Sequence, residues 1–211
     1  GAAPKWGYIG VYEDFLIAGA GEVQYTDFLD DVPEGKKARF YDLDLTASKH
    51  LIVMDRHSGE VLWTRSSTLG FRHNAIVVGN GQVYCIDRLP DPVEGALKRR
   101  GHKVADRPAL LALDVRTGAV TWQREDGVFG TWLSYSSEHD VLLQAGRKSR
   151  DMVVGEVDEG MAAFRGDTGQ RLWSNTAKYG GPCILHGESI ITDRYAYHLL
   201  SGEQILRRDP L

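Results

Sequence analysis

The sequence predicts an all-β protein, and three observations lead to that prediction. The 211-residue chain contains 24 glycines but only 7 prolines, and it uses Val, Ile, Tyr and Trp often, which favours many short strands joined by tight turns. Hydrophobic residues make up 42% of the chain and charged residues 26%, so a sizeable core can form. One hairpin-like segment also occurs four times.

The repeated segment is centred on a Ser/Thr-Gly step. Residues 53–63 and 112–122 match position for position, and residues 163–173 and 196–206 are the third and fourth copies. In each copy a β-rich run leads into a hydroxyl residue and a glycine that is free to adopt positive φ, and a second β-rich run follows. We therefore predict a β-hairpin at each copy, with a tryptophan anchoring the outgoing strand of the first three.

A second hairpin precedes each copy. It is clearest where residues 75–78 and 82–86 flank the turn Gly79-Asn80-Gly81, since Asn-Gly is a strong turn signal. Equivalent strand pairs are expected at residues 8–11 with 15–18, 132–135 with 141–144, and 183–185 with 189–192. Each repeat thus has four strands, and four-stranded antiparallel sheets repeated in tandem indicate a β-propeller.

About four blades are predicted within a single domain at residues 1–211, spanning residues 6–65, 72–124, 130–175 and 180–208. A two-sheet sandwich is the alternative architecture, although a sandwich does not need the same hairpin four times. The glycines of the repeated step are Gly59, Gly118, Gly169 and Gly202, so the spacing shortens from 59 through 51 to 33 residues. The extra length lies between the second and third strands, at about residues 21–49, 88–107 and 146–160. These insertions are expected on one face, which repeat proteins often use for binding.

The string Ala-x-Asp-x-x-Thr-Gly-x-x-x-Trp at residues 112–122 resembles the blade motif of pyrroloquinoline-quinone-type propellers. That family includes quinoprotein dehydrogenases and a non-catalytic outer-membrane assembly scaffold. The resemblance implies that the Trp packs between neighbouring blades while the Asp and Thr tie the hairpin. The structural blade residues it assigns are Asp55, Gly59, Trp63, Asp114, Gly118, Trp122, Gly169, Trp173 and Gly202.

The copies depart from this motif toward the end of the chain. Arg165 and His198 occupy the Asp position, and Leu206 occupies the Trp position. The last blade is therefore expected to pack loosely or to meet a different neighbour.

The resemblance also implies seven or eight blades, so we expect the chain to be a piece of a longer protein. If it is stable alone, it forms either a compact four-bladed ring or an open half whose exposed terminal faces pair with a second copy. The expected partners are the remaining blades of a parent protein or a second copy, with a further protein partner on the face that carries the insertions.

Composition excludes several other classes. The formal charge of −4 and the pI near 6.0 argue against nucleic-acid binding, and no apolar run approaches the roughly 18 residues of a membrane span. Cys85 and Cys183 show no Cys-x-x-Cys spacing, so neither a disulfide scaffold nor a zinc ribbon is encoded. No signal peptide is visible at residues 1–6, and a bacterial, periplasmic or secreted location is implied by the resemblance only.

No hydrolase, phosphate-loop or metalloprotease motif occurs in the sequence. By resemblance, a quinone enzyme requires a carboxylate base, a cation, a calcium cage and, in many relatives, two adjacent cysteines, which are absent. The acids Asp27, Asp30, Asp31, Asp42 and Asp44 lack calcium-loop spacing, so we interpret them as solvated loop residues with no metal site. The predicted function is a non-catalytic binding or scaffolding module without an evident cofactor. The alternative is a segment of a pyrroloquinoline-quinone- and calcium-dependent alcohol or sugar dehydrogenase.

Candidate ligand-binding residues lie where strands meet the insertions. An Arg fork and a His at residues 72–74 suit recognition of a carboxylate or phosphate, with hydrogen bonding between blades as the alternative. Two Asp-Arg pairs close equivalent strands and either line a polar pocket or form local ion pairs of little energy. The basic stretch after Leu97 is expected to solvate a loop, with phosphate binding as the alternative. The candidate ligand-binding residues are Arg72, His73, Asn74, Asp87, Arg88, Asp193 and Arg194.

Overall fold

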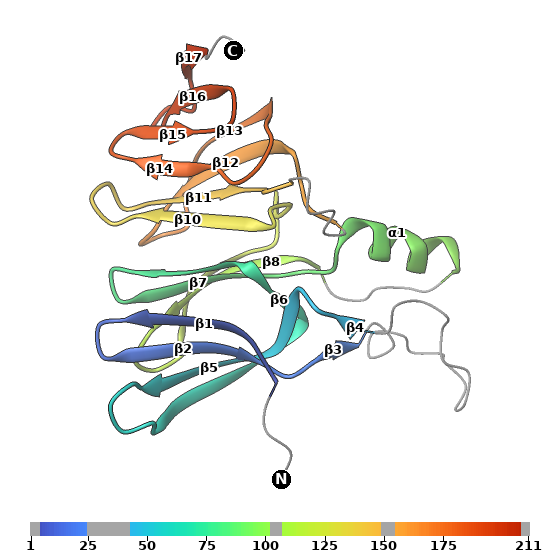
Figure 1. The fold of residues 1–211 in the computed structure, drawn as a ribbon, viewed down its shortest axis with the longest axis vertical. Helices are drawn as coiled ribbons and strands as arrows, with labels where there is room; N and C mark the ends of the chain where they lie inside the picture. Colours follow the sequence, from blue (N-terminus) through green and yellow to red (C-terminus); the bar gives the residue numbers. More distant parts are fainter. Residues whose placement is uncertain (1–4, 25–42, 102–106, 149–154, 208–211) are drawn as a thin grey trace.

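Antiparallel sheets follow one another along the chain and make up most of the molecule (Figure 1). The computed structural model describes residues 5–24, 43–101, 107–148 and 155–207. Within these ranges we distinguish four four-stranded units. Unit 1 comprises β1 (Trp6–Tyr12), β2 (Phe15–Ala20), β5 (Ala47–Asp55) and the first part of β6 (Val61–Gly79). Unit 2 comprises the rest of β6 with β7 (Gln82–Asp87), β8 (Ala109–Asp114) and β9 (Val120–Arg124).

The other two units are separate sheets. Unit 3 comprises β10 (Trp132–Ser136), β11 (Val141–Ala145), β12 (Glu159–Arg165) and β13 (Arg171–Lys178). Unit 4 comprises β14 (Ile184–His186), β15 (Ser189–Ile191), β16 (Tyr195–His198) and β17 (Gln204–Arg207). The all-β, propeller-like architecture agrees with the prediction from the sequence.

The boundary between units 1 and 2 differs from the prediction. A break was expected between residues 65 and 72, but β6 runs unbroken from Val61 to Gly79 and joins both units into one seven-stranded sheet. Phe71 pairs with Ser48 of β5 and also with Asp87 of β7. Gly70, at φ 131°, takes up the change of direction in a backbone region that favours glycine.

The described parts of the insertions lie on one side of the sheets, as predicted (Figure 1). β3 (Val23–Gln24) and β4 (Leu43–Asp44) follow β2 in the sequence, precede β5 and pair with each other. Helix α1 (Asp91–Arg99) follows β7 and precedes β8 in the sequence. The short hairpin turns β1–β2 and β10–β11 lie on the other side. One side of the molecule therefore carries the long connections.

Helix α1 was not predicted. Pro92 stands in its first turn, Asp91 and Glu94 place acidic groups at its N-terminal end, and the Lys98 ammonium lies 2.5 Å from the Glu94 carboxylate. These are ordinary helix signals. The basic stretch expected to be a loop thus begins in the last turn of a helix.

One kind of contact recurs at each junction between consecutive units. A tryptophan indole lies on the hairpin glycine of the following unit and donates its Nε1–H to a backbone carbonyl of that hairpin. The bonds are Trp63 to Val115 at 2.9 Å, Trp122 to Gly166 at 2.7 Å, and Trp173 to Leu199 at 2.8 Å. A Cβ built on the glycine would lie 2.7 Å from the indole at Gly118, 2.6 Å at Gly169 and 2.5 Å at Gly202. Only glycine permits this close approach.

The hairpins themselves are tied locally. The Asp114 carboxylate accepts bonds from the Thr117 hydroxyl and backbone N–H, both at 2.8 Å, and these bonds lower the pKa of Asp114. Where His198 replaces this aspartate, the backbone bond from Gly202 N to the His198 carbonyl remains, at 2.8 Å. Tyr197 and Leu199 are buried against unit 3. On this side the last unit is not loosely packed.

Three hydrophobic clusters lie between consecutive units, and a smaller one packs Leu97 of α1 with Leu69 and Leu89. The outward faces of units 1 and 4 have no such cover. Ile9 and Val11 on β1 are 64% and 59% exposed, and Leu206 on β17 is 61% exposed. These faces lie at opposite ends of the molecule (Figure 1), so the described residues do not close into a ring.

Candidate functional site

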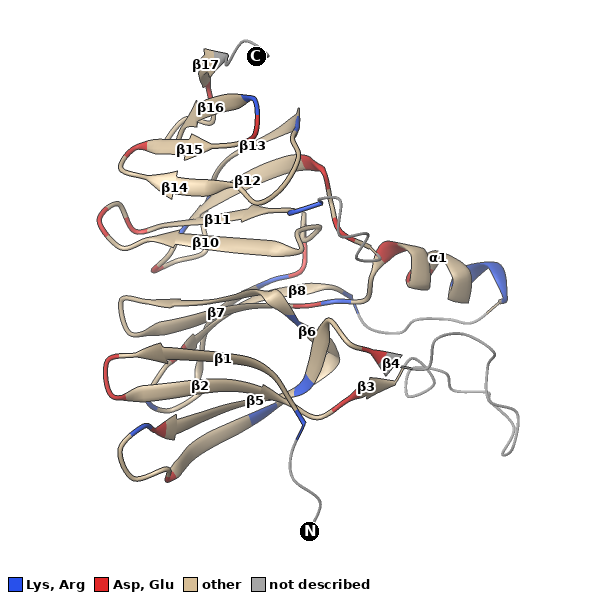
Figure 2. Cartoon of the chain, in the orientation of Figure 1, with Lys and Arg blue, Asp and Glu red and all other residues tan. Residues whose placement is uncertain are grey.

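Polar side chains gather at the loop-bearing ends of units 1 to 3. Figure 2 shows both signs of charge where β6, β7 and β8 meet the insertions. We define this polar cluster by the buried polar residues of the described chain, which are Asp44, Ser48, Arg72, Asp87, Arg88, Thr131 and Gln144. Three of the candidate ligand-binding residues belong to it.

Arg72 is committed to internal partners. Its guanidinium binds the Asp44 carboxylate and the Thr46 hydroxyl. Asp44 also accepts bonds from Thr46 N at 2.9 Å and from the Thr46 hydroxyl at 2.6 Å. Asp44 is therefore a buried ion-pair partner, and its interpretation as a solvated loop acid was wrong. The other acids considered with it (Asp27, Asp30, Asp31 and Asp42) lie outside the described residues.

This pair predicts a loss of stability in acid. Burial alone would raise the pKa of Asp44, but the Arg72 charge and the Thr46 bonds hold it below its ordinary value of 3.8. Because the folded-state pKa is the lower one, the stabilisation is present above pH 3.8 and is lost as the pH falls through the folded-state pKa. Urea unfolding between about pH 6 and pH 2 should show a steeper fall for wild type than for Asp44→Asn. Equal slopes would contradict this assignment.

His73 and Asn74 also face protein groups. The His73 ring lies on Gly7, and His73 Nε2 is 2.8 Å from the Ser48 hydroxyl. Burial, followed by the Arg72 charge, lowers the pKa of His73. Asn74 donates to Glu156 Oε1 at 3.3 Å, so it links β6 to the insertion of unit 3. These contacts match the alternative of bonding between units, and a ligand role for them stays a prediction.

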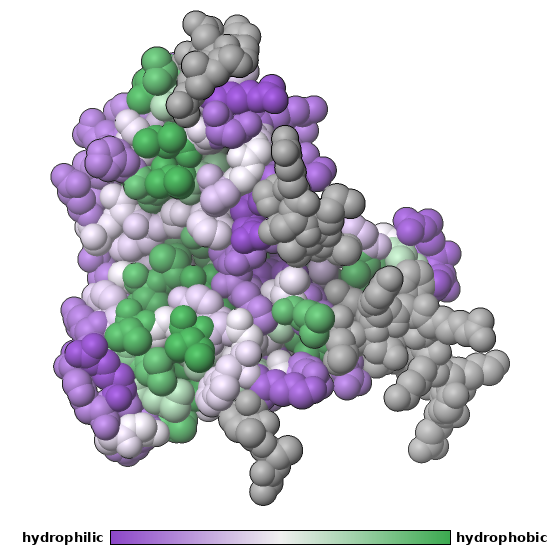
Figure 3. Space-filling model, viewed as in Figure 1, coloured by the Kyte–Doolittle hydropathy of each residue, from purple (hydrophilic) through white to green (hydrophobic). Residues whose placement is uncertain are grey.

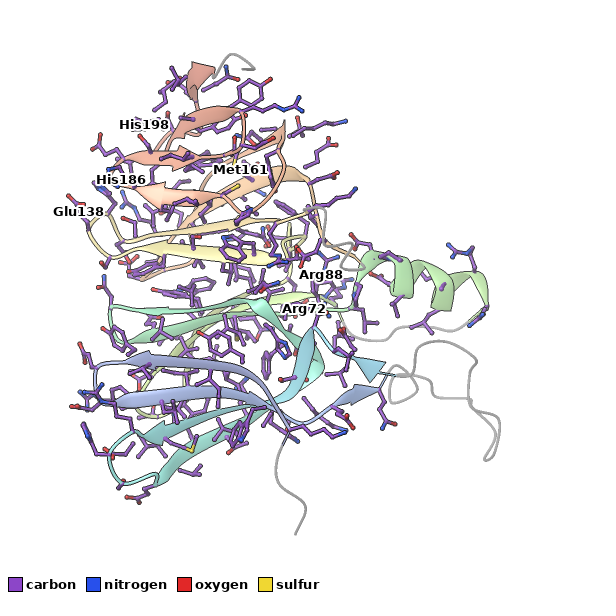
Figure 4. All side chains as sticks on the ribbon, in the orientation of Figure 1. Arg72, Arg88, Glu138, Met161, His186 and His198 are labelled. Atoms are coloured by element: carbon purple, nitrogen blue, oxygen red, sulfur yellow. The ribbon has the colours of Figure 1, made fainter. Side chains whose placement is uncertain are left out.

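Asp87 and Arg88 do not pair with each other: Asp87 binds residues 68–70 within β6, and Arg88 binds the connections that follow β7 and β9. Asp87 is 4% exposed and accepts four bonds from the backbone and hydroxyl of residues 68–70. The Arg88 guanidinium binds the carbonyls of Leu89 and Phe129 and the Asp91 carboxylate. Burial lowers the pKa of Arg88, and Asp91 opposes that shift. Figure 4 shows Arg72 and Arg88 near the base of α1.

Asp193 and Arg194 lie in a different environment. They form an exposed ion pair at 3.4 Å, with Arg194 75% exposed, and Asp193 accepts one bond from Gly180 N at 2.9 Å. Both line a groove of about 720 Å³ between units 3 and 4, together with Asn175, Lys178 and Tyr195. The two Asp-Arg pairs are thus equivalent in sequence but not in surroundings.

Sequence reasoning missed Ser48, Thr131 and Gln144 of the polar cluster, and it also missed Glu156 beside them. Glu156, whose side chain is only 5% exposed, accepts a bond from the Thr131 hydroxyl at 2.6 Å. Gln144 accepts bonds from Phe129 N at 3.2 Å and Gly130 N at 3.1 Å. Gln144 is the one polar residue of the otherwise apolar strand β11 (Val141–Ala145), and that contrast was the available signal in the sequence.

The described residues also bear on metal binding, thiol reactivity and membrane insertion. In the described ranges, no three His, Cys, Asp or Glu side chains are grouped to hold a metal ion. Both cysteines are buried, and burial raises the pKa of Cys183 to about 12, so its thiolate is scarce at neutral pH. Among the described helical residues there is no apolar helix of membrane-spanning length.

Comparison with known proteins identifies the family. A family model described as outer membrane protein assembly factor BamB matches residues 41–210. No curated protein sequence matches the chain. Among solved structures, BamB from Moraxella catarrhalis is 14% identical at a TM-score of 0.51, over 94% of this chain and 62% of its own. A europium-containing methanol dehydrogenase is 16% identical at a TM-score of 0.52, over 97% and 49%. A quinohemoprotein alcohol dehydrogenase from Pseudomonas putida HK5 is 14% identical at a TM-score of 0.51, over 95% and 34%.

These structural matches show the fold alone, because their identities are low. The chain spans less than two thirds of the length of each of them. The family match covers most of the chain, including all of units 2 and 3. The chain therefore belongs to the BamB-like family of pyrroloquinoline-quinone-type β-propeller repeat proteins.

Proposed function

We propose that this chain is a non-catalytic binding or scaffolding module that supplies four blades to a larger β-propeller protein. The observation that carries the proposal is that charged side chains of the polar cluster are buried and already bonded within the protein. Arg72, Asp87 and Arg88 are buried and bonded to protein groups. Side chains held in this way fix the loops in place, which suits a surface that must keep its shape.

Catalysis requires a different arrangement. A general base must lie within hydrogen-bond reach of the substrate proton, and a reacting charge must become more stable in the transition state. The Asp44 carboxylate is occupied by Arg72 and Thr46, and the Asp87 carboxylate by residues 68–70. Neither group has an open side toward a substrate in this arrangement.

The described residues do not fit a quinone and calcium site. Calcium takes six to eight oxygen ligands, whereas in the described chain no three acidic, His or Cys side chains are grouped. The buried carboxylates Asp44 and Asp87 face donors of the protein itself. The resemblance to methanol and alcohol dehydrogenases thus concerns their fold.

A cofactor titration tests the proposal. Pyrroloquinoline quinone is added to the chain with calcium, and the absorbance spectrum and the Tm are followed. We expect neither a shift in absorbance nor a rise in Tm, because a ligand that prefers the folded state must raise stability. A saturable absorbance shift together with a higher Tm would establish the alternative, a segment of a quinone- and calcium-dependent dehydrogenase.

The family match supports a proposal for location and partners. Its description names an outer membrane assembly factor, so we place this chain in the periplasm or outside the cell of a bacterium. Further blades of a larger protein are its first partners. For a separate protein partner we favour the loop-bearing side, where the exposed Asp193 and Arg194 line the groove between units 3 and 4.

A further inference from the structure

The groove between units 3 and 4 is lined mainly by groups that form hydrogen bonds. Asn175 and Lys178 of β13 lie on one side of it, and Tyr195 of β16 and Gln204 of β17 lie on the other. Figure 3 shows hydrophilic surface over β16 and the end of β13. Ala177 is the one aliphatic residue among the described residues of the lining. A peptide partner is usually anchored by side chains that fill dry, well-packed pockets, and this lining is too polar to supply one.

The charges of the groove are balanced. Each charged residue of the described lining has a partner of opposite sign. The pairs are Lys178 with Glu159 at 3.4 Å, Arg194 with Asp193 at 3.4 Å, and Lys148 with Asp158 at 2.9 Å. Their side chains are between 39% and 80% exposed, so they can form further hydrogen bonds. The groove thus offers donors and acceptors together, without a net charge that would attract an ion.

Tyr195 adds a fixed aromatic ring to this polar lining. Its backbone is tied to the Thr192 hydroxyl, which lies 3.0 Å from Tyr195 N and 2.9 Å from the Tyr195 carbonyl. Its ring packs edge-on against that of Tyr197, with the centroids 6.2 Å apart, and Tyr197 is buried. Tyr195 itself is half-buried. A ring held in this way is a stacking surface whose ordering costs little entropy on binding.

These properties together select an uncharged ligand that is rich in hydroxyl groups. A hydroxyl both donates and accepts hydrogen bonds, which matches the mixed side chains of the groove, including the exposed Thr176 and Gln204. A sugar ring also has C–H groups on one face, and these pack on an aromatic ring. The groove volume of about 720 Å³ lies within the usual range of small-molecule sites, so a short oligosaccharide has room there.

We propose that the groove between units 3 and 4 binds an uncharged oligosaccharide. One sugar ring stacks on Tyr195, and its hydroxyl groups form hydrogen bonds with the Asp193–Arg194 pair and the Gln204 amide. The inference goes beyond the proposed function, because it gives the groove itself a ligand, whereas a protein partner contacts the loop-bearing side around it. It holds whether or not the larger protein is catalytic.

Three uncharged trisaccharides serve as probes: maltotriose, cellotriose and chitotriose in its N-acetylated form. They differ in linkage and substituent but share hydroxyl groups and a C–H face. Saturation-transfer NMR titration of the chain should give a saturable signal with at least one of them, at a Kd of about 1 mM or below. The Kd should stay the same when the salt concentration is raised from about 50 to about 500 mM, because an uncharged ligand is not screened.

Matched variants locate the binding. Tyr195→Ala should raise the Kd at least about tenfold, whereas Tyr195→Phe should keep it within about threefold, because the ring rather than the hydroxyl stacks on the sugar. Gln204→Ala should raise the Kd about threefold or more through the lost hydrogen bonds. Gln170→Ala is its control, since Gln170 is also an exposed glutamine but lies in the hairpin of unit 3, outside the groove lining, and it should leave the Kd unchanged.

Three results would overturn the proposal. If none of the trisaccharides binds, the groove is left to a protein partner. If binding weakens with salt, or if inorganic phosphate displaces the sugar, the groove is an anion site. If Tyr195→Ala, shown to be folded by circular dichroism, binds as tightly as wild type, the sugar lies elsewhere. No quinone or calcium is used, so the result is independent of the cofactor titration.

Discussion

Replacing Trp122 by alanine is expected to lower the free energy of unfolding by about 3–5 kcal/mol. The indole lies between units 2 and 3, donates to the Gly166 carbonyl at 2.7 Å and has its ring centroid 6.0 Å from that of Tyr84. Truncation removes these contacts and leaves a cavity above Gly169 that the rigid hairpin cannot fill. Urea unfolding followed by fluorescence measures the change.

Trp6→Ala provides the comparison. Trp6 begins β1, is 44% exposed and stands outside the repeated hairpins. Its loss should cost less than about 1 kcal/mol. If both variants lost the same stability, the contact between the indole and the hairpin glycine would contribute no more to the stability of the protein than an exposed tryptophan does.

Asp87→Ala is expected to destabilise the protein by about 3 kcal/mol or more. The carboxylate accepts bonds from Thr68 N at 2.7 Å, from the Thr68 hydroxyl at 2.8 Å, from Leu69 N at 2.8 Å and from Gly70 N at 2.7 Å. Leu69 and Gly70 are buried, so water cannot easily replace the lost acceptor. The bend of β6 would lose its support, and thermal unfolding should shift to a lower Tm.

The matched variant is Asp193→Ala. Asp193 closes the equivalent strand region of unit 4, but its side chain is 39% exposed and accepts one backbone bond. A cost below about 1 kcal/mol is expected, because solvent can satisfy the freed donor. Comparable losses at both positions would show that burial is not the deciding difference.

The hairpins could be predicted from the sequence because their chemistry is local. The Ser/Thr-Gly step, the positive φ of its glycine and the tryptophan four residues later all lie within eleven positions, and the structure repeats them. The unbroken β6 could not be predicted in this way. Its continuity depends on pairing of Phe71 with strands on both sides, which is tertiary information that no short window contains.

The polar cluster shows the same limit. Arg72, His73 and Asn74 attract attention as a dense polar group, but their partners Asp44, Ser48 and Glu156 are distant in the sequence. Burial converts such groups from potential ligand contacts into structural bonds. Asp193 and Arg194 show the reverse case, since the short connection in unit 4 leaves them exposed.

The unbroken β6 has a consequence for how the chain loses its structure. Units 1 and 2 share a hydrogen-bonded strand, so neither can open without exposing the sheet edge of the other, and the two behave as one cooperative block. Units 3 and 4 attach through side chains and short connections. We therefore expect partial unfolding to begin in the C-terminal half and the N-terminal half to melt last.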